Sequence, residues 1–371
     1  MSGEGRPILQ LCHGYYGPFL DCARQYARLF RGTPHQVVTV QLIDQPDEKV
    51  IQTLAPDEVI FLGHESEAMS GLKWKVIREV RRIAASRDFC LCIAQRFKSM
   101  YTGLLATDLP VIGVHHTFGD YRRLGRRLFA SAFKKRLRLL GVSDAIQQDI
   151  RAALPAWPAS RIATLYNRID VDAVQSRLIS RETARAALGL PLDSWVVGNV
   201  GRLHPDKDQA TLIRAFALAR PSLPSQSVLA IMGSGRLENA LKALANELGV
   251  IDGIRFLGQV EEGRRYFKAF DVFALSSDRE PFGMVLLEAL AAHLPVVCSD
   301  CGGGREVVAE IGDLFPFGNA EALAQCLIRL AGRKMPADYP ERVQRHLREK
   351  FSDEAAQKAF WELPMVREIL A

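Results

Sequence analysis

Short apolar runs alternate with segments of helical spacing along the chain, and the series starts afresh near the middle. The first half contains PILQLCH, a helical pattern from Asp21 to Phe30, QVVTVQLI, EVIFLG, FCLCIA and PVIGVHH, and then the units RLLGVSDAIQQDI and RIATLYNRIDV. The second half contains WVVGNVGRL, SVLAIMGSG, IRFLGQV, VFALSS and PVVCSD. Strands that alternate with helices form parallel sheets covered on both faces. The sequence therefore predicts an α/β protein with two Rossmann-like, doubly wound domains in tandem.

The length of the chain, 371 residues, exceeds what a single core of ordinary size holds. We expect an N-terminal domain over residues 1–172 and a C-terminal domain over 193–345. A linker is expected over 173–192, where Gly189 and Pro191 interrupt the pattern. The helical tail, 346–371, is expected to cross back to the N-terminal domain. Two such domains would face each other across a cleft, a common place for ligands.

The beginning of the chain lacks a basic-then-apolar segment that ends in a small-residue cleavage site, and no apolar run reaches about eighteen residues. We therefore expect a cytoplasmic protein. Seven cysteines, an odd number, fit reduced thiols. Cys298 and Cys301 form a lone C-x-x-C without a second ligand pair, so we expect them to pack in the core and predict no metal site.

Positive charge is concentrated in one segment. The formal net charge is only +6, yet eight basic residues and no acidic residue lie between Tyr121 and Leu140. The predicted positive face of the N-terminal half calls for an anionic partner.

The second half carries two charged motifs that suit a nucleotide. In GRLHPDKDQATLIRAF, a strand ends at Gly201 and the loop presents Arg202 and Lys207 just before a helix. Cations beside a helix amino end favour a diphosphate, because backbone N–H groups and aligned peptide dipoles add to their charge. Basic loop residues are also often merely solvated, so this motif alone leaves both interpretations open.

The motif DREPFGMVLLEAL places Glu280 and Glu288 eight residues apart. We expect Pro281, Phe282 and Gly283 to open a helix that carries Glu288 about two turns in, with both carboxylates on one side. Carboxylates accept hydrogen bonds from sugar and ribose hydroxyls, and N–H groups at Phe282 and Gly283 suit phosphate. Taken alone, the pair would equally fit a helix-capping Glu and a solvated one.

Together, the segments GRLHPDK, MGSG, RFLG, EPFGMVLLE, PVV and GGGREVV resemble the nucleotide-binding domain of family 4 glycosyltransferases, which are retaining enzymes of the two-domain GT-B fold. The pattern is most similar to lipopolysaccharide core glycosyltransferases. The resemblance implies that Arg202 and Lys207 hold the diphosphate of the sugar donor and stabilise the departing nucleotide. It assigns the donor sugar's hydroxyls to Glu280 and the ribose to Glu288.

The resemblance also implies binding roles for backbone positions of the second half. Phe282 and Gly283 match N–H donors to the phosphate or sugar. Gly233 and Gly235 match the turn after the second strand, and Gly258 with Val260 matches the stretch that receives the base. Glu306 falls near the sugar end.

The N-terminal half resembles the family in a looser way. HGYYGP corresponds to a loop that approaches the donor phosphate, here with Gly14 and Gly17 separated by two tyrosines. PVIGVHHTF corresponds to a strand that ends in an active-site histidine. The spacing from Pro110 favours His116 over His115, although a histidine at a strand end is often structural. Arg168 stands where the family has a glycine.

The resemblance implies a retaining transfer without a committed protein nucleophile, in which cations stabilise the leaving diphosphate. The sequence has no D-x-D pair at a strand end near the motifs, so we expect metal independence and no cofactor. The expected co-substrate is a nucleotide sugar, with UDP favoured because it is the most frequent donor in the family.

The acceptor must be inferred from the N-terminal half. YRRLGRRLFASAFKKRLRLL predicts a basic helix with an apolar stripe, and GLKWKVIREVRRIAASR predicts another. Either could face the core, but two in one domain favour an anionic membrane surface. We therefore expect a peripheral enzyme at the inner face of the cytoplasmic membrane that glycosylates a lipid-linked or oligosaccharide acceptor, such as the lipopolysaccharide core.

Four other functions fit parts of the sequence. They are a glycosyltransferase with a soluble acceptor, a sugar-nucleotide epimerase of the same fold, a nicotinamide-dependent dehydrogenase and a basic nucleic-acid-binding protein. Neither GNVGRL nor MGSGRL completes the dinucleotide fingerprint. The arginine clusters lack a stacking motif or zinc module, so no nucleic-acid partner is expected.

Overall fold

The computed structural model describes residues 5–15, 18–54 and 58–370. The chain divides into two compact units. Unit 1 comprises residues 1–167 together with 353–371, and unit 2 comprises residues 168–352. Each unit is built around its own parallel sheet, as the alternating pattern predicts.

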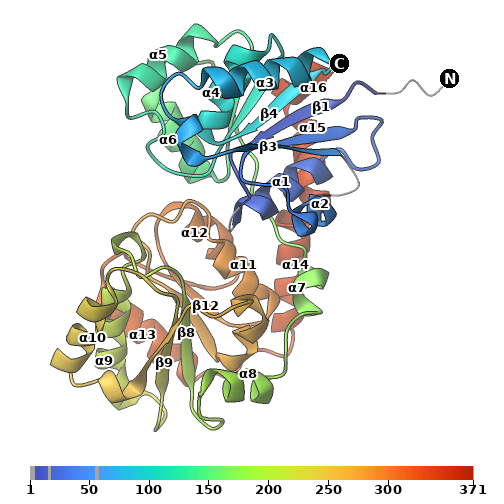
Figure 1. Cartoon of the computed structure of the whole chain (residues 1–371). Coiled ribbons are helices and arrows are strands. Elements are labelled where there is room, and N and C mark those ends of the chain that lie inside the picture. Colours follow the sequence, from blue (N-terminus) through green and yellow to red (C-terminus); the bar gives the residue numbers. More distant parts are fainter. Residues whose placement is uncertain (1–4, 16–17, 55–57, 371) are drawn as a thin grey trace. The chain divides into compact units, whose positions relative to one another are not determined.

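The sheet of unit 1 has seven strands in the order β3-β2-β1-β4-β5-β6-β7 (Figure 1). Their bounds are β1 Ile8–Cys12, β2 Val37–Ile43, β3 Glu58–His64, β4 Leu91–Gln95, β5 Val111–His115, β6 Leu137–Gly141 and β7 Ile162–Thr164. All neighbouring strands pair in parallel. Runs of β-branched and leucine side chains form these strands because both faces of the sheet are covered. The order reverses between β1 and β4, which makes this pair the switch point of the sheet.

The helices that cover this sheet are α1 Pro18–Arg28, α2 Glu48–Leu54, α3 Trp74–Ala85, α4 Arg96–Ala106, α5 Leu124–Ala132 and α6 Asp144–Ala153. Helix α1 packs against α2, and α3 packs against α4. Because parallel crossovers are right-handed, the reversal of strand order puts these two pairs on opposite faces. Ser143 begins α6 by accepting a hydrogen bond from the backbone of Ile146.

The last two helices, α15 Asp353–Glu362 and α16 Pro364–Leu370, belong to unit 1. Arg28 at the end of α1 forms an ion pair of 2.6 Å with Asp353. Trp361 donates a hydrogen bond to the carbonyl of Leu29. Phe360 contacts the ring of Phe30 edge to face. The tail expected at 346–371 therefore joins unit 1 only from Asp353, while α14 Tyr339–Lys350 lies in unit 2.

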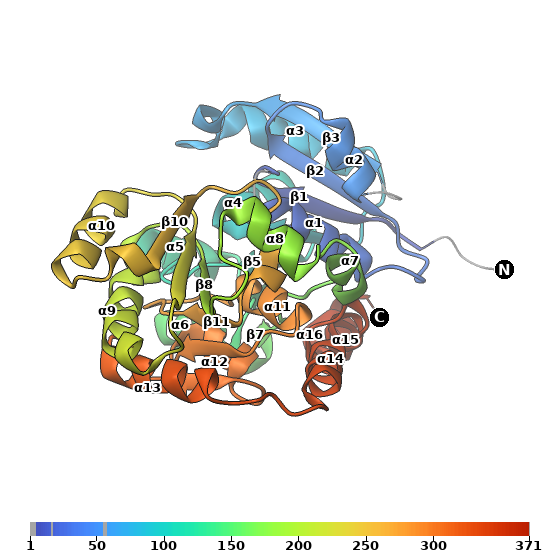
Figure 2. The ribbon, with the colours of Figure 1, turned by 90° about the horizontal axis from the view of Figure 1, so that it is seen from below.

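The sheet of unit 2 has six strands in the order β10-β9-β8-β11-β12-β13. Their bounds are β8 Val196–Val200, β9 Val228–Met232, β10 Ile254–Gly258, β11 Val272–Leu275, β12 Val296–Ser299 and β13 Asp313–Phe315. The helices are α7 Val171–Gln175, α8 Arg181–Leu188, α9 Gln209–Ala219, α10 Glu238–Glu247, α11 Met284–Ala291, α12 Gly302–Val308 and α13 Ala320–Ala331, besides α14. Helix α9 lies beside α13, as Figure 1 and Figure 2 both show. The order of strands reverses between β8 and β11.

The segment expected to be a linker, 173–192, lies inside unit 2. Ser180 caps α8, and Gly189 ends it with a φ of 63°. The guanidinium of Arg185 is buried and donates to the backbone of Pro191 and Leu192 and to the carboxylate of Asp271. A linker would be solvated, so these buried contacts identify the segment as part of the packed unit.

The basic segment of the N-terminal half is also not one amphipathic helix. Helix α5 ends at Ala132, and Leu137 begins the buried strand β6. Arg136 donates to backbone carbonyls that include Thr107, and Arg138 pairs with Glu368 at 2.9 Å. These two arginines therefore contribute to packing, and the exposed positive surface is smaller than the sequence suggests. Among the described residues, no helix combines the length and the apolar character that crossing a bilayer requires.

Candidate functional site

The predicted nucleotide motifs of unit 2 meet at the switch point of its sheet. Strands β8 and β11 are neighbours, and each is followed at its carboxyl end by a motif loop. Ligands of open α/β sheets bind outside these carboxyl ends, where the strand order reverses. The fold thus brings together two loops that are distant in sequence.

The loop after β8 presents one exposed cation and one enclosed cation. The Arg202 side chain is 75% exposed and lies 3.7 Å from Asp206. The loop is fixed because Gln209 donates to the carbonyl of Arg202. Asp208, with a φ of 42°, caps α9 by accepting from Thr211. Arg202 can therefore move toward a ligand while its backbone stays in place.

Lys207 reaches across the switch point to the other loop. Its Nζ lies 2.6 Å from Oε2 of Glu280, and the two side chains are 17% and 9% exposed. Ser277 donates from Oγ to the same carboxylate oxygen at 3.1 Å. Ser276 donates to the carbonyl of Lys207. These bonds hold an ammonium and a carboxylate side by side at the carboxyl ends of β8 and β11.

The structure corrects the expected placement of the two glutamates. Helix α11 begins at Met284, so Glu280 lies in the loop before it and Glu288 lies about one turn into it. Gly283 precedes the helix with a φ of 97°, a conformation that favours glycine. The side chain of Phe282 is buried. Glu288 is largely buried and forms an ion pair of 2.7 Å with Arg264.

The predicted turn glycines are required by close backbone approach. Gly233 has a φ of 138°, and a Cβ there would lie 2.0 Å from the carbonyl oxygen of Gly201. A Cβ on Gly235 would lie 2.4 Å from the carbonyl oxygen of Leu203. Gly233 also donates to the carbonyl of Gly258 at the end of β10. Val260 follows β10 and is partly buried.

Sequence reasoning gave no role to four residues that shape this site. Ser277 and Arg264 hold the two glutamates, as described above. Gly302 and Gly303 let the start of α12 pack closely against the loop that contains Glu280. A Cβ on Gly302 would lie 2.3 Å from the carbonyl oxygen of Glu280. The three consecutive glycines before REVV could have indicated in the sequence that two backbone segments come close together here. Glu306 lies on α12 and is partly buried.

In unit 1, too, loops meet at the carboxyl ends of the two strands that form the switch point. His13 and Gly14 follow β1, and Arg96 follows β4 in a left-handed conformation with a φ of 73°. A Cβ on Gly14 would meet Asp44, whose Oδ2 accepts from the backbone N–H of Tyr15. Burial, together with Arg96 and Lys98, lowers the pKa of His13 to about 4. Gly17, the other predicted loop glycine, lies outside the described residues.

The two adjacent histidines of the predicted strand end have different surroundings. His115 is fully buried in β5 and lies 2.8 Å from Asp120 and 3.1 Å from the hydroxyl of Tyr121. His116 lies just beyond the strand, partly buried, with Nε2 2.9 Å from Oε1 of Gln95. Burial, together with His115 and Arg96, lowers the pKa of His116 to about 3. His116 is therefore neutral near pH 7.

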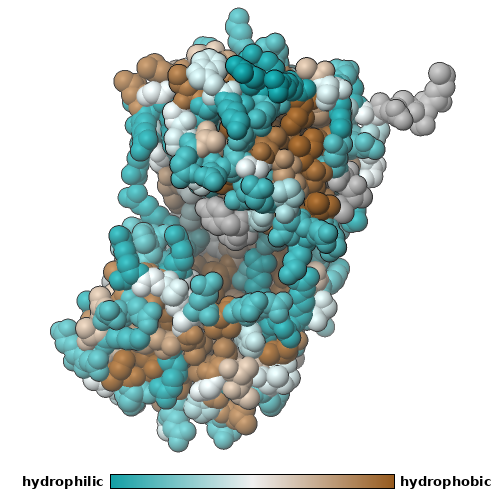
Figure 3. Space-filling view, in the orientation of Figure 1, coloured by the Kyte–Doolittle hydropathy of each residue, from teal (hydrophilic) through white to brown (hydrophobic). Residues whose placement is uncertain are grey.

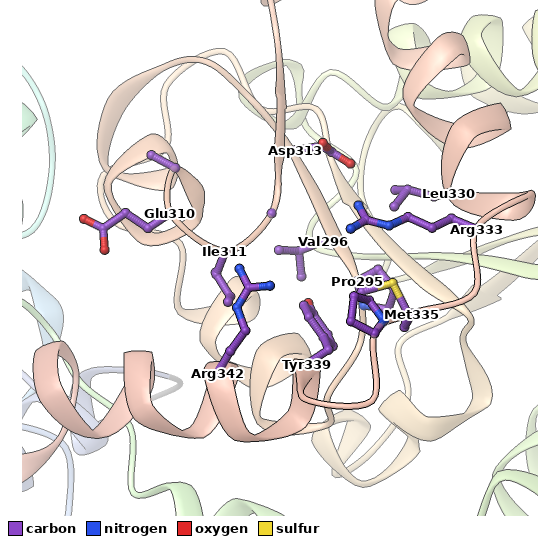
Figure 4. Close-up of a pocket in the computed structure, with 13 residues that line it drawn as sticks. Pro295, Val296, Glu310, Ile311, Asp313, Leu330, Arg333, Met335, Tyr339 and Arg342 are labelled. Carbon is purple, nitrogen blue, oxygen red and sulfur yellow. The ribbon is translucent and has the colours of Figure 1, made fainter.

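A cavity of about 180 Å³ lies at the opposite edge of the unit 2 sheet (Figure 4). It is lined by Pro295 and Val296 at the start of β12 and by side chains of α14. Tyr339 and Arg342 point from α14 toward Val296. Because this cavity adjoins the amino end of the strand, it is separate from the site of Lys207 and Glu280.

The second half of the chain is similar to known glycosyltransferases. Residues 180–350 match the family model described as glycosyl transferases group 1. A D-inositol 3-phosphate glycosyltransferase of Saccharomonospora viridis is 32% identical over 67% of this chain and 64% of its own length. The lipopolysaccharide core biosynthesis glycosyltransferase LpsE of Rhizobium meliloti is 35% identical over 48% of this chain and 52% of its own length. The chain thus spans about half to two thirds of the length of these curated relatives.

The fold has close counterparts among solved structures. Anabaena HepE, solved in complex with UDP and glucose, superimposes with a TM-score of 0.75 and 22% identity, over 96% of this chain and 98% of that one. This likeness extends over both units and supports the two-sheet architecture. The chain therefore has the GT-B fold, and residues 180–350 match the family described as glycosyl transferases group 1.

Proposed function

We propose that the protein is a retaining, metal-independent glycosyltransferase that moves a hexose or N-acetylhexosamine from a nucleotide diphosphate sugar to a glycolipid. The observation that carries this proposal is the contact between Lys207 and Glu280 at the switch point of the unit 2 sheet, with Arg202 exposed on the same loop as Lys207. A cation and a hydroxyl-binding carboxylate lie together where a diphosphate joins a sugar. UDP is the proposed nucleotide, a choice supported by the ligands of HepE.

In this proposal the barrier falls mainly through electrostatics. As the bond between the anomeric carbon and the diphosphate oxygen breaks, negative charge builds up on that oxygen. Arg202 and Lys207 stabilise this charge before and during the step, so no metal is needed. The acceptor oxygen bonds to the anomeric carbon from the same face, and its proton passes to the departing diphosphate. Glu280 holds the sugar through its hydroxyls, and Glu288 holds the ribose.

The N-terminal residues would act on the sugar end. By their sequence motifs we assign Gly14 and Gly17 to the phosphate loop, and Gly233, Gly235, Gly258, Val260, Phe282 and Gly283 to the nucleotide site. A neutral His116 donates from Nε2 to Gln95, so its Nδ1, which lies 3.9 Å from Sγ of Cys22, is the nitrogen that can accept a hydrogen bond from a sugar hydroxyl. Its contact with Gln95 fixes the orientation of the ring.

A membrane-bound acceptor is supported by exposed apolar side chains next to basic ones. Leu72, Trp74, Leu124 and Leu128 are each 60–65% exposed. Leu72 and Trp74 lie just before and at the start of α3, Leu124 and Leu128 lie on α5, and Figure 3 shows hydrophobic surface over α5. Such side chains among cations suit an anionic membrane surface, in keeping with a peripheral enzyme at the inner leaflet. The relative LpsE supports a lipopolysaccharide core acceptor.

The test is release of nucleotide from a panel of nucleotide sugars with and without lipopolysaccharide core acceptor, in excess chelator. We expect acceptor-dependent UDP release and a product whose anomeric configuration, read by proton NMR, matches the donor. An epimerase would convert the sugar nucleotide without an acceptor, and inversion would overturn the retaining mechanism. Loss of activity in chelator would overturn metal independence.

A further inference from the structure

A cavity of about 420 Å³ in unit 1 is lined mainly by cations and aromatic rings. Its lining residues are Met69, Ser70, Gly71, Lys73, Phe97, Lys98, Tyr101, Arg123 and Arg126. They come from the segments that follow β3, β4 and β5, so the cavity lies at the carboxyl edge of the sheet, the edge to which His116 belongs. No acidic residue is among them.

Aromatic rings lie beside two of these cations. The Nζ of Lys73 lies 4.5 Å from the centre of the Tyr101 ring, and the guanidinium of Arg126 lies 4.4 Å from that of Phe97. A cation–π contact positions a cation without cancelling its charge. The cavity therefore keeps a strong positive potential.

Ion pairs neutralise little of this charge. Arg126 pairs with Asp120 at 2.9 Å. Within the described part of the chain, no ion pair involves Lys73, Lys98 or Arg123. Burial, with the charges of Lys98 and Arg126, lowers the pKa of Lys73. Mutual repulsion of this kind is relieved by an anion between the cations.

The backbone at Lys73 adds a second indication of function. Lys73 has a φ of 55° and precedes α3, and its Nζ donates to the carbonyl of Gly71. A lysine in the left-handed region is strained, and such strain is kept where a site requires it. The conformation turns the lysine into the cavity beside Tyr101.

A hydrogen-bonded chain joins the cavity to His115, the residue before the predicted histidine. Arg126 donates to Oδ1 of Asp120, and Oδ2 of Asp120 lies 2.8 Å from Nδ1 of His115. His115 immediately precedes His116 in the sequence. An anion in the cavity would therefore lie at the same edge of the sheet as His116.

We propose that this cavity binds a phosphate group carried by the acceptor sugar, with Lys73, Lys98, Arg123 and Arg126 as its ligands. The proposal rests on the glycosyl-transfer function proposed above and specifies its acceptor as a phosphorylated saccharide. A dianionic phosphate suits several cations converging from three segments, and 420 Å³ also admits the sugar ring. In this proposal the exposed leucines and Trp74 contact the membrane, and the cations of the cavity bind the phosphate.

The test is calorimetric titration with glucose 6-phosphate and with glucose, in saturating UDP so that the diphosphate site is filled. We expect the sugar phosphate to bind more tightly than glucose. Binding should weaken about tenfold or more in the double variant Lys98→Ala, Arg123→Ala, because both side chains are exposed and give charged hydrogen bonds. The matched control Arg82→Ala, Lys135→Ala removes equal charge from exposed positions outside the cavity and should bind as the parent does.

Two outcomes would overturn the inference while UDP still binds. One is equal affinity for glucose and glucose 6-phosphate. The other is a cavity variant that loses only its binding to phosphatidylglycerol vesicles, which would assign the cations to a lipid headgroup. Failure of UDP to bind the parent protein would instead count against the proposed function.

Discussion

Lys207 and Glu280, 73 residues apart in sequence, meet at 2.6 Å between the loops that follow β8 and β11. Their side chains are mostly buried, and Ser277 adds a second hydrogen bond to the carboxylate. The pair fixes both loops in one geometry. The ammonium has further N–H groups to donate, and the same loop carries the exposed Arg202.

Replacing Arg202 by alanine tests the diphosphate role with little risk to folding. Its side chain is 75% exposed, so stability should change by no more than about 0.5 kcal/mol. Turnover should fall about a hundredfold, because one stabilising charge at the leaving group is lost. The control Arg214→Ala, at an exposed position of α9, should behave as the parent in the same nucleotide-release assay. Equal turnover of both variants would contradict the assignment.

Substitutions of Glu280 should separate its charge from its hydrogen bonds. Glu280→Gln keeps an oxygen for Ser277 and should lower donor turnover about tenfold. Glu280→Ala also removes the oxygen that accepts from Lys207 and Ser277, so it should in addition cost up to about 3 kcal/mol of unfolding free energy. Denaturant unfolding and donor kinetics measure the two effects. Identical stability of the two variants would show that the hydrogen bonds accepted by residue 280 do not support the loops.

Gly233→Ala should damage both the fold and nucleotide binding. The new Cβ would lie 2.0 Å from a backbone oxygen at a φ of 138°, so we expect a loss of about 2 kcal/mol or more. Gly332 offers a matched control, since a Cβ there meets nothing closer than 3.8 Å. Gly332→Ala should unfold near the parent's midpoint. A stable Gly233→Ala protein with normal UDP affinity would refute the close approach.

Acid should destabilise the protein partly through His116. Its folded pKa is about 3, whereas an unfolded histidine takes up a proton near pH 6.5. Between these values the unfolded chain binds more protons, so stability falls as the pH drops from about 6.5 toward 3. Unfolding midpoints measured from pH 7 to pH 4.5 should fall less steeply for His116→Asn than for the parent. Parallel curves would mean that His116 protonates freely in the folded state.

Membrane binding should depend on the exposed apolar residues of unit 1. Trp74→Ser together with Leu128→Ser should weaken binding to anionic vesicles at low salt, since apolar contact adds to the charge attraction. Leu218→Ser removes an exposed leucine from unit 2 and serves as the control. UDP affinity should be equal in all three proteins. Vesicle binding that is unchanged in the double variant would rule out this surface.

The sequence predicted the two parallel sheets well, because strand runs and loop motifs are local signals. Val196–Val200 and Val228–Met232 are both strands that end in the predicted loops. The contact of Lys207 with Glu280 could not be read from spacing, since it arises only when β8 and β11 become neighbours. The partner of Glu288, Arg264, is likewise a product of the fold.

The helical spacing of apolar residues gave a wrong prediction in the basic segment, because that segment forms both a helix and a strand. Leu124 and Leu128 were grouped with Leu137 and Leu140 in one stripe, yet the first pair is exposed on α5 and the second is buried in β6. The packing role of Arg136 escaped notice because its side chain donates to carbonyls of a different segment. The predicted roles of Gly14, His116 and Val260 remain predictions.

The return of the chain to unit 1 at Asp353 has a consequence for synthesis. Unit 2 is one uninterrupted stretch and can complete its contacts while still near the ribosome, whereas the part translated first must wait for the final helices to cover Phe30. A stop codon shortly before Asp353 would therefore remove helices that unit 1 needs, although unit 1 is translated first, and would leave unit 2 complete.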